Sequence, residues 1–230
     1  MLLALELFLA AASCKGTLYL TIDTGSMSQA DRIAQILNKH KVKATFFLAN
    51  EKTIHEDYTL DDAWASYWKA RAAEGHKFGT HTWRHGYYCA DLPGGKVRYV
   101  VKGKPELQDQ AAVCKELDRV NARFEQMTGR KLDPIWRAPG GHTTPGVLKL
   151  AQACGYTHIG WPEAGFLGDE LPSDKFPNKM LLERALKNLK DGDILLMHTG
   201  IWSRKDPFAP MLDPLLEGLT AKGFCFATIP

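Results

Sequence analysis

The segment TLYLTIDTG, residues 17–25, decides the fold class of this chain. Its first part is rich in apolar and β-branched side chains, as buried strands are, and an aspartate follows where the apolar run stops. From there to the C-terminus, short runs of this kind alternate with longer segments of helical period. Because that alternation is typical of βα units, we expect an α/β fold built on a parallel sheet.

Seven segments have the composition and the flanking residues of strands. They span residues 17–22, 43–48, 76–80, 134–137, 156–161, 193–198 and 224–229. Residues 106–127 carry an apolar stripe at helical spacing that stops at Gly129, which predicts a long helix. Ser28 is expected to cap a second helix, and Thr144 followed by Pro145 to open a third.

The bulk composition favours a single globular domain. With 230 residues, 45% of them apolar and 24% charged, the chain can bury one sizeable core but is too short for two domains of typical size. Its 29 basic and 26 acidic residues give a net charge of +3 and are dispersed along the chain. We therefore expect no nucleic-acid partner.

An N-terminal segment, residues 1–16, is set apart from a catalytic domain over residues 17–230. Residues 1–13 are apolar except for Glu6, and this run is shorter than the about 20 residues that a transmembrane helix needs. The segment is either the remnant of a signal or anchor, with Cys14 as a lipid-attachment site, or a trimmed or helical N-terminus. The location stays open, with the cell envelope or another extracytoplasmic site favoured over the cytoplasm.

The cysteines are too few and too irregularly spaced for a disulfide framework. They are Cys14, Cys89, Cys114, Cys154 and Cys225. We expect them mainly as buried small apolar side chains. A bridge such as Cys89–Cys114 is the alternative in an oxidising compartment, although spacing alone cannot fix the pairing.

Residues 87–105 interrupt the alternation of strands and helices. They contain Pro-Gly-Gly and a short Val-Arg-Tyr-Val-Val run. We interpret this segment as an insertion, folded as a β-hairpin, on the rim of the fold. Loops on such rims often shape substrate clefts.

Polar side chains follow the ends of several expected strands. They are Asp23, Thr24, Glu51, His81, His85, Arg137 and His198. In parallel α/β folds ligands bind at the carboxyl ends of the strands, so we expect these side chains to share one edge. His81 and His85 would project from one face of a helical turn and could hold a divalent cation. Each residue alone also has an ordinary explanation, as a cap, an ion-pair partner or a buried histidine.

Four motifs occur in order after these strands: TIDTG at 21–25, HTWRH at 81–85, RAPGG at 137–141 and LMH at 196–198. Together they resemble the ordered motifs of the polysaccharide deacetylases, the NodB-homology or carbohydrate esterase family 4 domains. The resemblance extends over residues 17–229. It implies a distorted (β/α)7 parallel barrel, an N-acetylated carbohydrate as substrate, and a metal-assisted hydrolase of amide bonds that removes acetyl groups.

The resemblance also implies the roles of the central residues. Asp23 would be the general base that takes a proton from the attacking water, and Arg137 would hold it ionised and oriented. His81 and His85 would be the imidazole ligands of a divalent metal, and zinc is the metal we expect. His198 would be the general acid that protonates the departing amine.

The supporting residues match the family less closely. By the same resemblance, the backbone N–H near Gly140 would stabilise the oxyanion. Asp169 is the candidate for the acid that supports the catalytic histidine. Trp161 and Trp202 are candidates for the apolar wall of the substrate site.

Thr24 is the main departure from the family's pattern, because a second aspartate normally stands there and completes a His-His-Asp metal site. A neutral hydroxyl is a poor replacement, so metal affinity should fall. Metal could still bind weakly through His81 and His85, Glu51 could reach in from the neighbouring strand, or the site could hydrolyse a small amide without metal. A catalytically inactive carbohydrate-binding domain is the remaining alternative.

An enzyme is favoured over an inactive domain because Asp23, Arg137 and His198 are all retained. The same residues would act on any acetamide, so they do not select between peptidoglycan, chitin-like oligomers and small acylated amines. No recognisable pattern indicates the oligomeric state.

Overall fold

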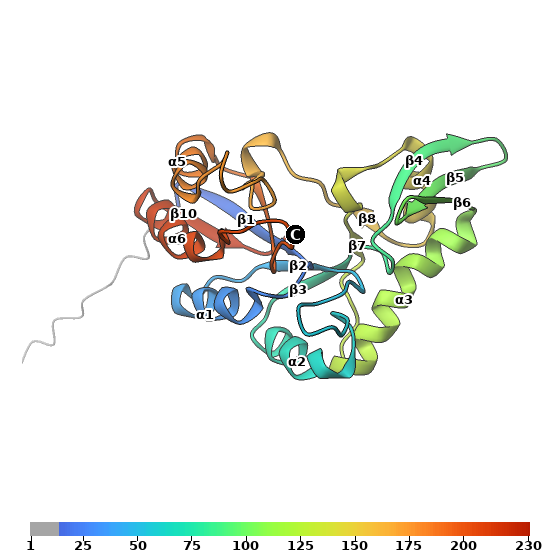
Figure 1. Cartoon of the computed structure of the whole chain (residues 1–230), viewed down its shortest axis with the longest axis horizontal. Coiled ribbons are helices and arrows are strands. Elements are labelled where there is room, and N and C mark those ends of the chain that lie inside the picture. The colour runs from blue at the N-terminus through green and yellow to red at the C-terminus, as the bar shows by residue number, and fades with distance from the viewer. Residues whose placement is uncertain (1–13) are drawn as a thin grey trace, which may run out of the picture.

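The computed structural model describes residues 14–230, which fold around a parallel sheet (Figure 1). Its strands are β1 (Gly16–Asp23), β2 (Thr45–Leu48), β3 (Lys77–Thr80), β7 (Ile135–Trp136), β8 (Thr157–His158), β9 (Ile194–His198) and β10 (Phe224–Ala227). Each overlaps one of the seven expected segments, so the strand predictions are confirmed.

The strands follow the order β10-β1-β2-β3-β7-β8, and β9 also pairs with β1. All of these pairs are parallel. Tyr19 of β1 pairs with both Ala227 of β10 and Ile194 of β9, so these two strands flank β1 on opposite edges. The sheet curls into an incomplete barrel (Figure 1), which confirms the expected α/β fold and its distorted (β/α)7 parallel barrel.

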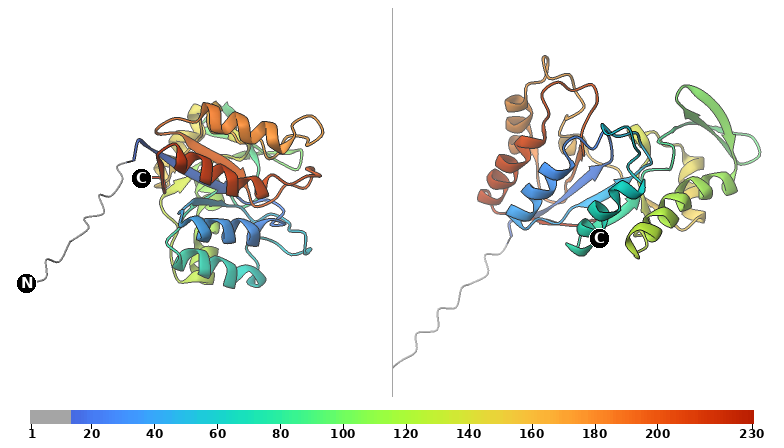
Figure 2. Two further views of the ribbon diagram at one scale, coloured as in Figure 1. Left: turned by 90° about the vertical axis from the view of Figure 1, so that its left-hand side faces the viewer. Right: turned by 60° about the horizontal axis from the view of Figure 1, so that its bottom comes forward.

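Helices pack along the outside of the curled sheet (Figures 1 and 2). They are α1 (Ala30–His40), α2 (Ala65–Ala73), α3 (Gln110–Thr128), α4 (Pro145–Ala153), α5 (Asn178–Asn188) and α6 (Leu212–Ala221). Short 3-10 turns occupy Asp62–Trp64, Pro139–Gly141, Glu163–Gly165 and Ala209–Met211. The sequence patterns did not predict α2, α5 and α6, in none of which a side chain caps the first turn.

The alternation along β1 explains how the fold positions its first polar residue. Leu18, Leu20 and Ile22 are fully buried in the main core cluster, which includes residues of the covering helices. Successive residues of a strand point to opposite faces, so Thr21 and Asp23 point into the interior of the curled sheet. The sequence of β1 thereby places the Asp23 carboxylate inside the barrel at the carboxyl end of the strand.

One predicted helix cap is confirmed and one is wrong. Thr144 caps α4, because its side chain accepts a hydrogen bond from the Val147 N–H at 3.2 Å. Ser28 does not cap α1, which begins at Ala30 without any side-chain cap. The Ser28 hydroxyl is instead hydrogen bonded to that of Ser26, at 3.1 Å.

The segment after β3 forms a separate three-stranded antiparallel sheet (Figures 1 and 2). Its strands are β4 (Tyr87–Leu92), β5 (Lys96–Val101) and β6 (Lys104–Gln108). The insertion is therefore longer than the hairpin expected over residues 87–105. The predicted start of the following helix at residue 106 is wrong for the same reason: α3 begins at Gln110, with the Asp109 side chain accepting from the Ala112 N–H.

The inserted sheet has a small core of its own. Tyr88, Val97 and Tyr99 are buried against residues of α3 and α4 and against Trp136 of β7. Because this cluster joins the insertion to helices that also cover the barrel, the inserted sheet is packed onto the domain instead of hanging free of it.

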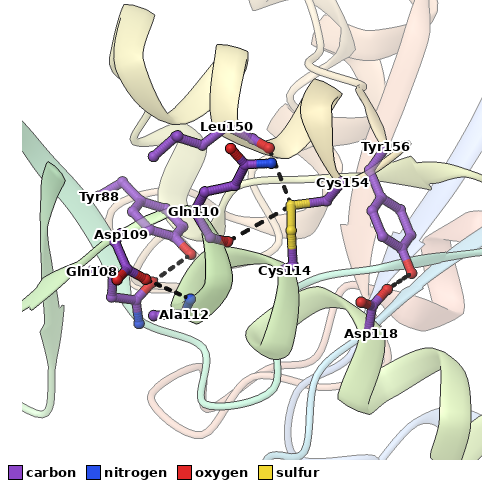
Figure 3. The surroundings of a disulfide bond; sticks show 10 residues. All are labelled: Tyr88, Gln108, Asp109, Gln110, Ala112, Cys114, Asp118, Leu150, Cys154 and Tyr156. Carbon is purple, nitrogen blue, oxygen red and sulfur yellow. Dashed lines mark hydrogen bonds between the residues drawn. A yellow bond between two sulfur atoms is a disulfide. The ribbon is translucent and has the colours of Figure 1, made fainter. Parts of the chain in front are cut away.

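Two disulfide bonds link distant parts of the chain. Cys114 of α3 is bonded to Cys154 at the end of α4 (Figure 3), and Cys14 is bonded to Cys225 of β10. Cys89 is free and exposed. The expectation of mainly buried apolar cysteines is therefore wrong, and so is the suggested Cys89–Cys114 pairing.

The two bonds close chain segments with sequence separations of 40 and 211 residues. Loop closure of this size stabilises the folded state by roughly 4 and 5 kcal/mol in the chain-entropy model. The bond to Cys225 also shows that the suggested lipid attachment at Cys14 is wrong, since the Cys14 sulfur is already bonded.

The predicted signal or anchor lies in residues 1–13, outside the described residues. From residue 14 onward, no helix is long and apolar enough to cross a bilayer.

Candidate active site

A groove of about 420 Å³ opens at the carboxyl ends of the parallel strands. Its lining consists of Thr24, Gly25, Glu51, His85, Glu170, Leu171, His198, Gly200, Ile201, Trp202 and Ser203. The structure thus gathers polar residues from the ends of β1, β2, β3 and β9 around one space, as the sequence led us to expect.

Asp23 and Arg137 form a buried ion pair beside this groove. Asp23 is 2% exposed and Arg137 is fully buried. Arg137 Nη1 donates to Asp23 Oδ1 at 3.0 Å and to Thr21 Oγ1 at 2.7 Å. Its Nε donates to the Ile159 carbonyl at 3.1 Å. The guanidinium is therefore held from several sides, and it orients the carboxylate through a charge-assisted hydrogen bond.

His81 presents its Nε2 atom toward the same carboxylate. His81 Nδ1 lies 2.9 Å from the Arg137 carbonyl oxygen. Because a carbonyl can only accept, Nδ1 carries the hydrogen, and Nε2, 3.5 Å from Asp23 Oδ2, keeps its lone pair. Burial above all, and then the charge of His85, hold the pKa of His81 well below its ordinary value. A neutral imidazole with a free Nε2 is the form that binds metal.

His85 lies beside His81, with the two ring centroids 4.9 Å apart. The expected helical turn is wrong, because residues 81–86 form an irregular loop. Thr82 and His85 both have left-handed backbone conformations, with φ of 64° and 52°. This path of the backbone, and not the spacing of a helix, brings the two imidazoles together.

The hydroxyl of Thr24, at the position of the missing aspartate, is engaged by the protein. It accepts a hydrogen bond from the Ala49 N–H at 3.0 Å and donates to Glu51 Oε2 at 2.7 Å. The other carboxylate oxygen of Glu51 lies 3.8 Å from His85 Nδ1. Thr24 therefore holds a carboxylate from the end of β2 close to one of the imidazoles.

These side chains fit a divalent metal site only in part. Paired imidazoles such as His81 and His85 suit zinc. Within residues 14–230, however, no three His, Cys, Asp or Glu side chains lie close enough together to hold a metal ion. The third ligand is the position that does not fit, because Thr24 has no charge and Glu51 is hydrogen bonded to it.

His198, at the end of β9, is the register partner of Asp23 across the β1–β9 pair. Its Nδ1 lies 3.0 Å from Asp169 Oδ1, and its backbone N–H donates to Asp169 Oδ2 at 2.7 Å. Burial opposes protonation, but the charge and hydrogen bond of Asp169 outweigh it and raise the pKa of His198 to about 9. The carboxylates of Asp23 and Glu170 act in the same direction. His198 is therefore protonated at neutral pH.

Gly25 allows the loops after β1 and β9 to meet at the groove. A Cβ atom at Gly25 would lie 2.3 Å from the Gly200 carbonyl oxygen, which is far inside van der Waals contact. Only glycine permits this approach, which keeps Thr24 and His198 on neighbouring walls of the groove.

Trp202 is 62% exposed and forms part of the groove wall. A second hollow of about 210 Å³ shares Glu51, His85 and Trp202 with the groove and adds Tyr58 and Lys102 to the lining. The indole thus stands between two adjoining hollows, a position in which an aromatic face can stack on a sugar ring.

Gly140 and Trp161, which were predicted to bind substrate, lie outside the groove and the hollow beside it. Among the described residues, neither belongs to the lining of these two hollows. The Arg137 guanidinium lies over the Trp161 ring, 5.1 Å from its centroid. Gly140 has a φ of 60° and lies beside His142 and Tyr87. Their substrate-binding roles stay predictions.

Glu170 was missed by the sequence reasoning. Its carboxylate lines the groove and lies 3.9 Å from His198 Nε2. The only available signal was its position next to Asp169, and a half-exposed glutamate in a loop is usually just solvated. A larger hollow of about 550 Å³, lined by residues such as Arg184, Lys190 and Asp193, contains none of the predicted site residues.

Comparison with the sequences of known proteins gives three results. A model of the polysaccharide deacetylase family matches residues 10–159. The chain is 28% identical over 214 residues to the peptidoglycan-N-acetylmuramic acid deacetylase PdaA of Bacillus subtilis, covering 93% of this chain and 70% of that protein. It is 25% identical over 214 residues to a peptidoglycan-N-acetylglucosamine deacetylase of Bacillus cereus, covering 91% and 84%.

Among solved structures, the chain resembles a CE4 family pseudoenzyme from Bacillus anthracis, with a TM-score of 0.70 and 22% identity. The match covers 94% of this chain and 64% of that one, so the chain spans less than two thirds of that structure. At this level of identity the likeness bears on the fold alone.

Proposed function

This chain belongs to the polysaccharide deacetylase family, and from its site we propose that it removes acetyl groups from N-acetylated sugars by hydrolysing the amide bond. One observation carries the proposal: the Asp23–Arg137 and Asp169–His198 pairs lie at the ends of adjacent strands, β1 and β9. They supply an oriented carboxylate and a protonated imidazole next to each other. The two peptidoglycan deacetylase relatives make peptidoglycan amino sugars the first substrates to test.

Asp23 would take a proton from the water that attacks the acetyl carbonyl. Its Oδ1 is held by Arg137, so Oδ2 is the oxygen available to the water. Proton transfer by a positioned side chain contributes about 10²- to 10⁴-fold to such reactions.

His198 would protonate the amine as the carbon–nitrogen bond breaks. Its Nδ1 hydrogen is bound by Asp169, which leaves the Nε2 proton for the leaving group. Asp169 also stabilises the imidazolium before transfer. The products are acetate and a free amino sugar.

His81 and His85 would hold a divalent metal, zinc first. When bound, such an ion supplies polarisation of the acetyl carbonyl and lowers the pKa of water. We propose that this binding is weaker than in a complete His-His-Asp site, because Thr24 contributes no charge and the nearest further carboxylate is that of Glu51.

A catalytically inactive carbohydrate-binding domain is the second candidate. It is favoured by the incomplete set of metal ligands among residues 14–230. Trp202, exposed between the two hollows, would then serve sugar binding alone. A metal-independent hydrolase of a small amide would use the same Asp23 and His198 and is the third reading of the site.

We also propose an extracytoplasmic location. Disulfide bonds persist in oxidising compartments and are rare in the cytosol. The described part of the chain contains two, Cys14–Cys225 and Cys114–Cys154. The peptidoglycan deacetylase relatives support the same location.

An acetate-release assay tests the proposed function. The purified chain is incubated with N-acetylglucosamine oligomers, peptidoglycan fragments and small amides, each with added zinc or with a chelator. We expect acetate release from the sugars that increases with zinc. Acetate release from small amides at a rate that the chelator does not lower would support the metal-independent hydrolase. Saturable oligosaccharide binding without any release would support the inactive domain.

Thr24→Asp is expected to tighten zinc binding on the order of tenfold, about 1.4 kcal/mol, because it restores a charged ligand. Calorimetric titration with zinc measures the change. Thr24→Asn is the matched control, since asparagine has the shape of aspartate without its charge. Glu51 lies 2.7 Å from the Thr24 hydroxyl and would repel the new carboxylate, so Thr24→Asp is also made with Glu51→Gln. Unchanged affinity in both backgrounds would show that His81 and His85 do not face a common ligand point.

A further inference from the structure

The loop between β3 and β4, residues 81–86, carries both imidazoles on a strained backbone. Thr82 and His85 adopt positive φ values of 64° and 52°. Side chains with a Cβ atom rarely adopt this conformation, and threonine is among the least suited to it. Such a conformation persists only where surrounding contacts determine it.

Tyr99, from β5 of the inserted sheet, contacts both ends of this loop. Its hydroxyl oxygen accepts a hydrogen bond at 2.9 Å from the N–H of Gly86, the residue after His85. The same hydroxyl lies 3.2 Å from the Oγ1 atom of Thr82, the residue after His81. Tyr99 is fully buried, and that burial raises the pKa of its hydroxyl far above the ordinary value, so the proton is retained.

Glu116 of α3 holds the middle of the loop. Its Oε2 accepts from the Arg84 N–H at 3.1 Å and lies 3.3 Å from the Tyr99 hydroxyl. Its backbone carbonyl accepts from the Trp83 N–H at 3.1 Å. The backbone N–H groups of Trp83, Arg84 and Gly86 are thus all bound by partners outside the loop.

The packing between Tyr99 and the loop is close. A Cβ atom at Gly86 would lie 2.4 Å from Cζ of the Tyr99 ring. The Arg84 guanidinium lies over the face of the same ring, 5.2 Å from its centroid. The ring therefore leaves no room for a side chain at residue 86, and the loop lies directly against it.

We propose that Tyr99 is a positioning residue of the active site: acting through Gly86 and Thr82, it keeps His81 and His85 aligned at the groove. The inserted sheet then braces the imidazole loop in addition to forming the rim. This inference rests on the proposed function, since the alignment serves catalysis only if the imidazoles do. The alignment itself is measurable without any activity.

Tyr99→Phe tests the proposal, with Tyr88→Phe as the matched control. Tyr88 is equally buried, its ring lies 4.6 Å from that of Tyr99, and its hydroxyl donates to Gln108 at 3.1 Å, away from the loop. In Tyr99→Phe we expect the Gly86 amide to exchange its hydrogen about tenfold faster and the His85 imidazole NMR signals to shift. Zinc binding, measured by calorimetry, should weaken. Tyr88→Phe should leave all three readouts as in the wild type.

The proposal is overturned if Gly86 exchange and the His85 signals of Tyr99→Phe match the wild type, or if Tyr88→Phe changes them equally. Thr82→Val, which removes the other hydroxyl, should shift the His85 signals in the same direction and serves as a second variant should Tyr99→Phe not fold. Wild-type protein that releases no acetate would refute the proposed function and leave the exchange and NMR tests of Tyr99 intact.

Discussion

Asp23→Asn is expected to lower acetate release by about 10²- to 10⁴-fold. Asparagine keeps the shape of the side chain and can still accept from Arg137, but it cannot take a proton from water. The loss should therefore appear in kcat. The free energy of unfolding should also fall, by about 3–5 kcal/mol, because the buried Arg137 guanidinium loses the charge of its partner. Steady-state kinetics on an N-acetylglucosamine oligomer, together with a urea titration, measures both.

Asp193→Asn is the matched control for this change. Asp193 is 4% exposed, just before β9, and its Oδ2 accepts from the Lys190 N–H at 2.9 Å, far along the strand from the groove. We expect its substitution to affect stability and leave kcat unchanged. Equal activity of Asp23→Asn and wild type would show that another group removes the proton.

Asp169→Asn is expected to move the alkaline limb of the pH–rate profile down from about pH 9, because the variant loses the charge that raises the pKa of His198. With an ordinary histidine pKa of about 6.5, turnover at pH 8 should fall on the order of 30-fold. Acetate release measured from pH 5 to pH 10 shows the shift. Glu170→Gln is the control, since that carboxylate is half exposed and 3.9 Å from Nε2, and it should move the limb only slightly.

The same pair makes a testable statement about stability. The folded-state pKa of His198, about 9, lies above the ordinary value of about 6.5, so the folded protein binds an extra proton between these pH values. The resulting stabilisation is fully present below about pH 6.5 and is lost as the pH rises through 9. Urea unfolding of Asp169→Asn should lack this loss. An unchanged pH dependence would mean that a different group titrates there.

The strands and the positions of the catalytic candidates could be predicted because both are local properties of the sequence. β1 shows its buried face in its own alternation, and Asp23 follows where that alternation stops. The carboxyl ends of parallel strands necessarily share one edge, so strand order was not needed to bring Asp23 and His198 together. Asp169 could be proposed as the partner of His198 only through the family resemblance, since 29 residues separate them.

Features that depend on tertiary contacts escaped prediction. The backbone of Thr82 and His85 has no helical or strand signature, because contacts from Tyr99 and Glu116 hold it. The hydrogen bond between Thr24 and Glu51 joins the ends of two strands and leaves no mark in either segment. The start of α3 was misplaced because residues 106–108 directly precede the helical stripe and pair with β5, and that pairing exists only in the folded sheet.

The bond between Cys14 and Cys225 has a mechanical consequence. It joins Cys14, two residues before β1, to the strand that pairs with the start of β1, at the end of the sheet away from the groove. A pulling force applied to the chain near residue 14 and near β10 would pass through a covalent link instead of peeling those two strands apart. Tension between these two points would therefore leave the pairing of β1 with β10 intact for as long as the disulfide is oxidised.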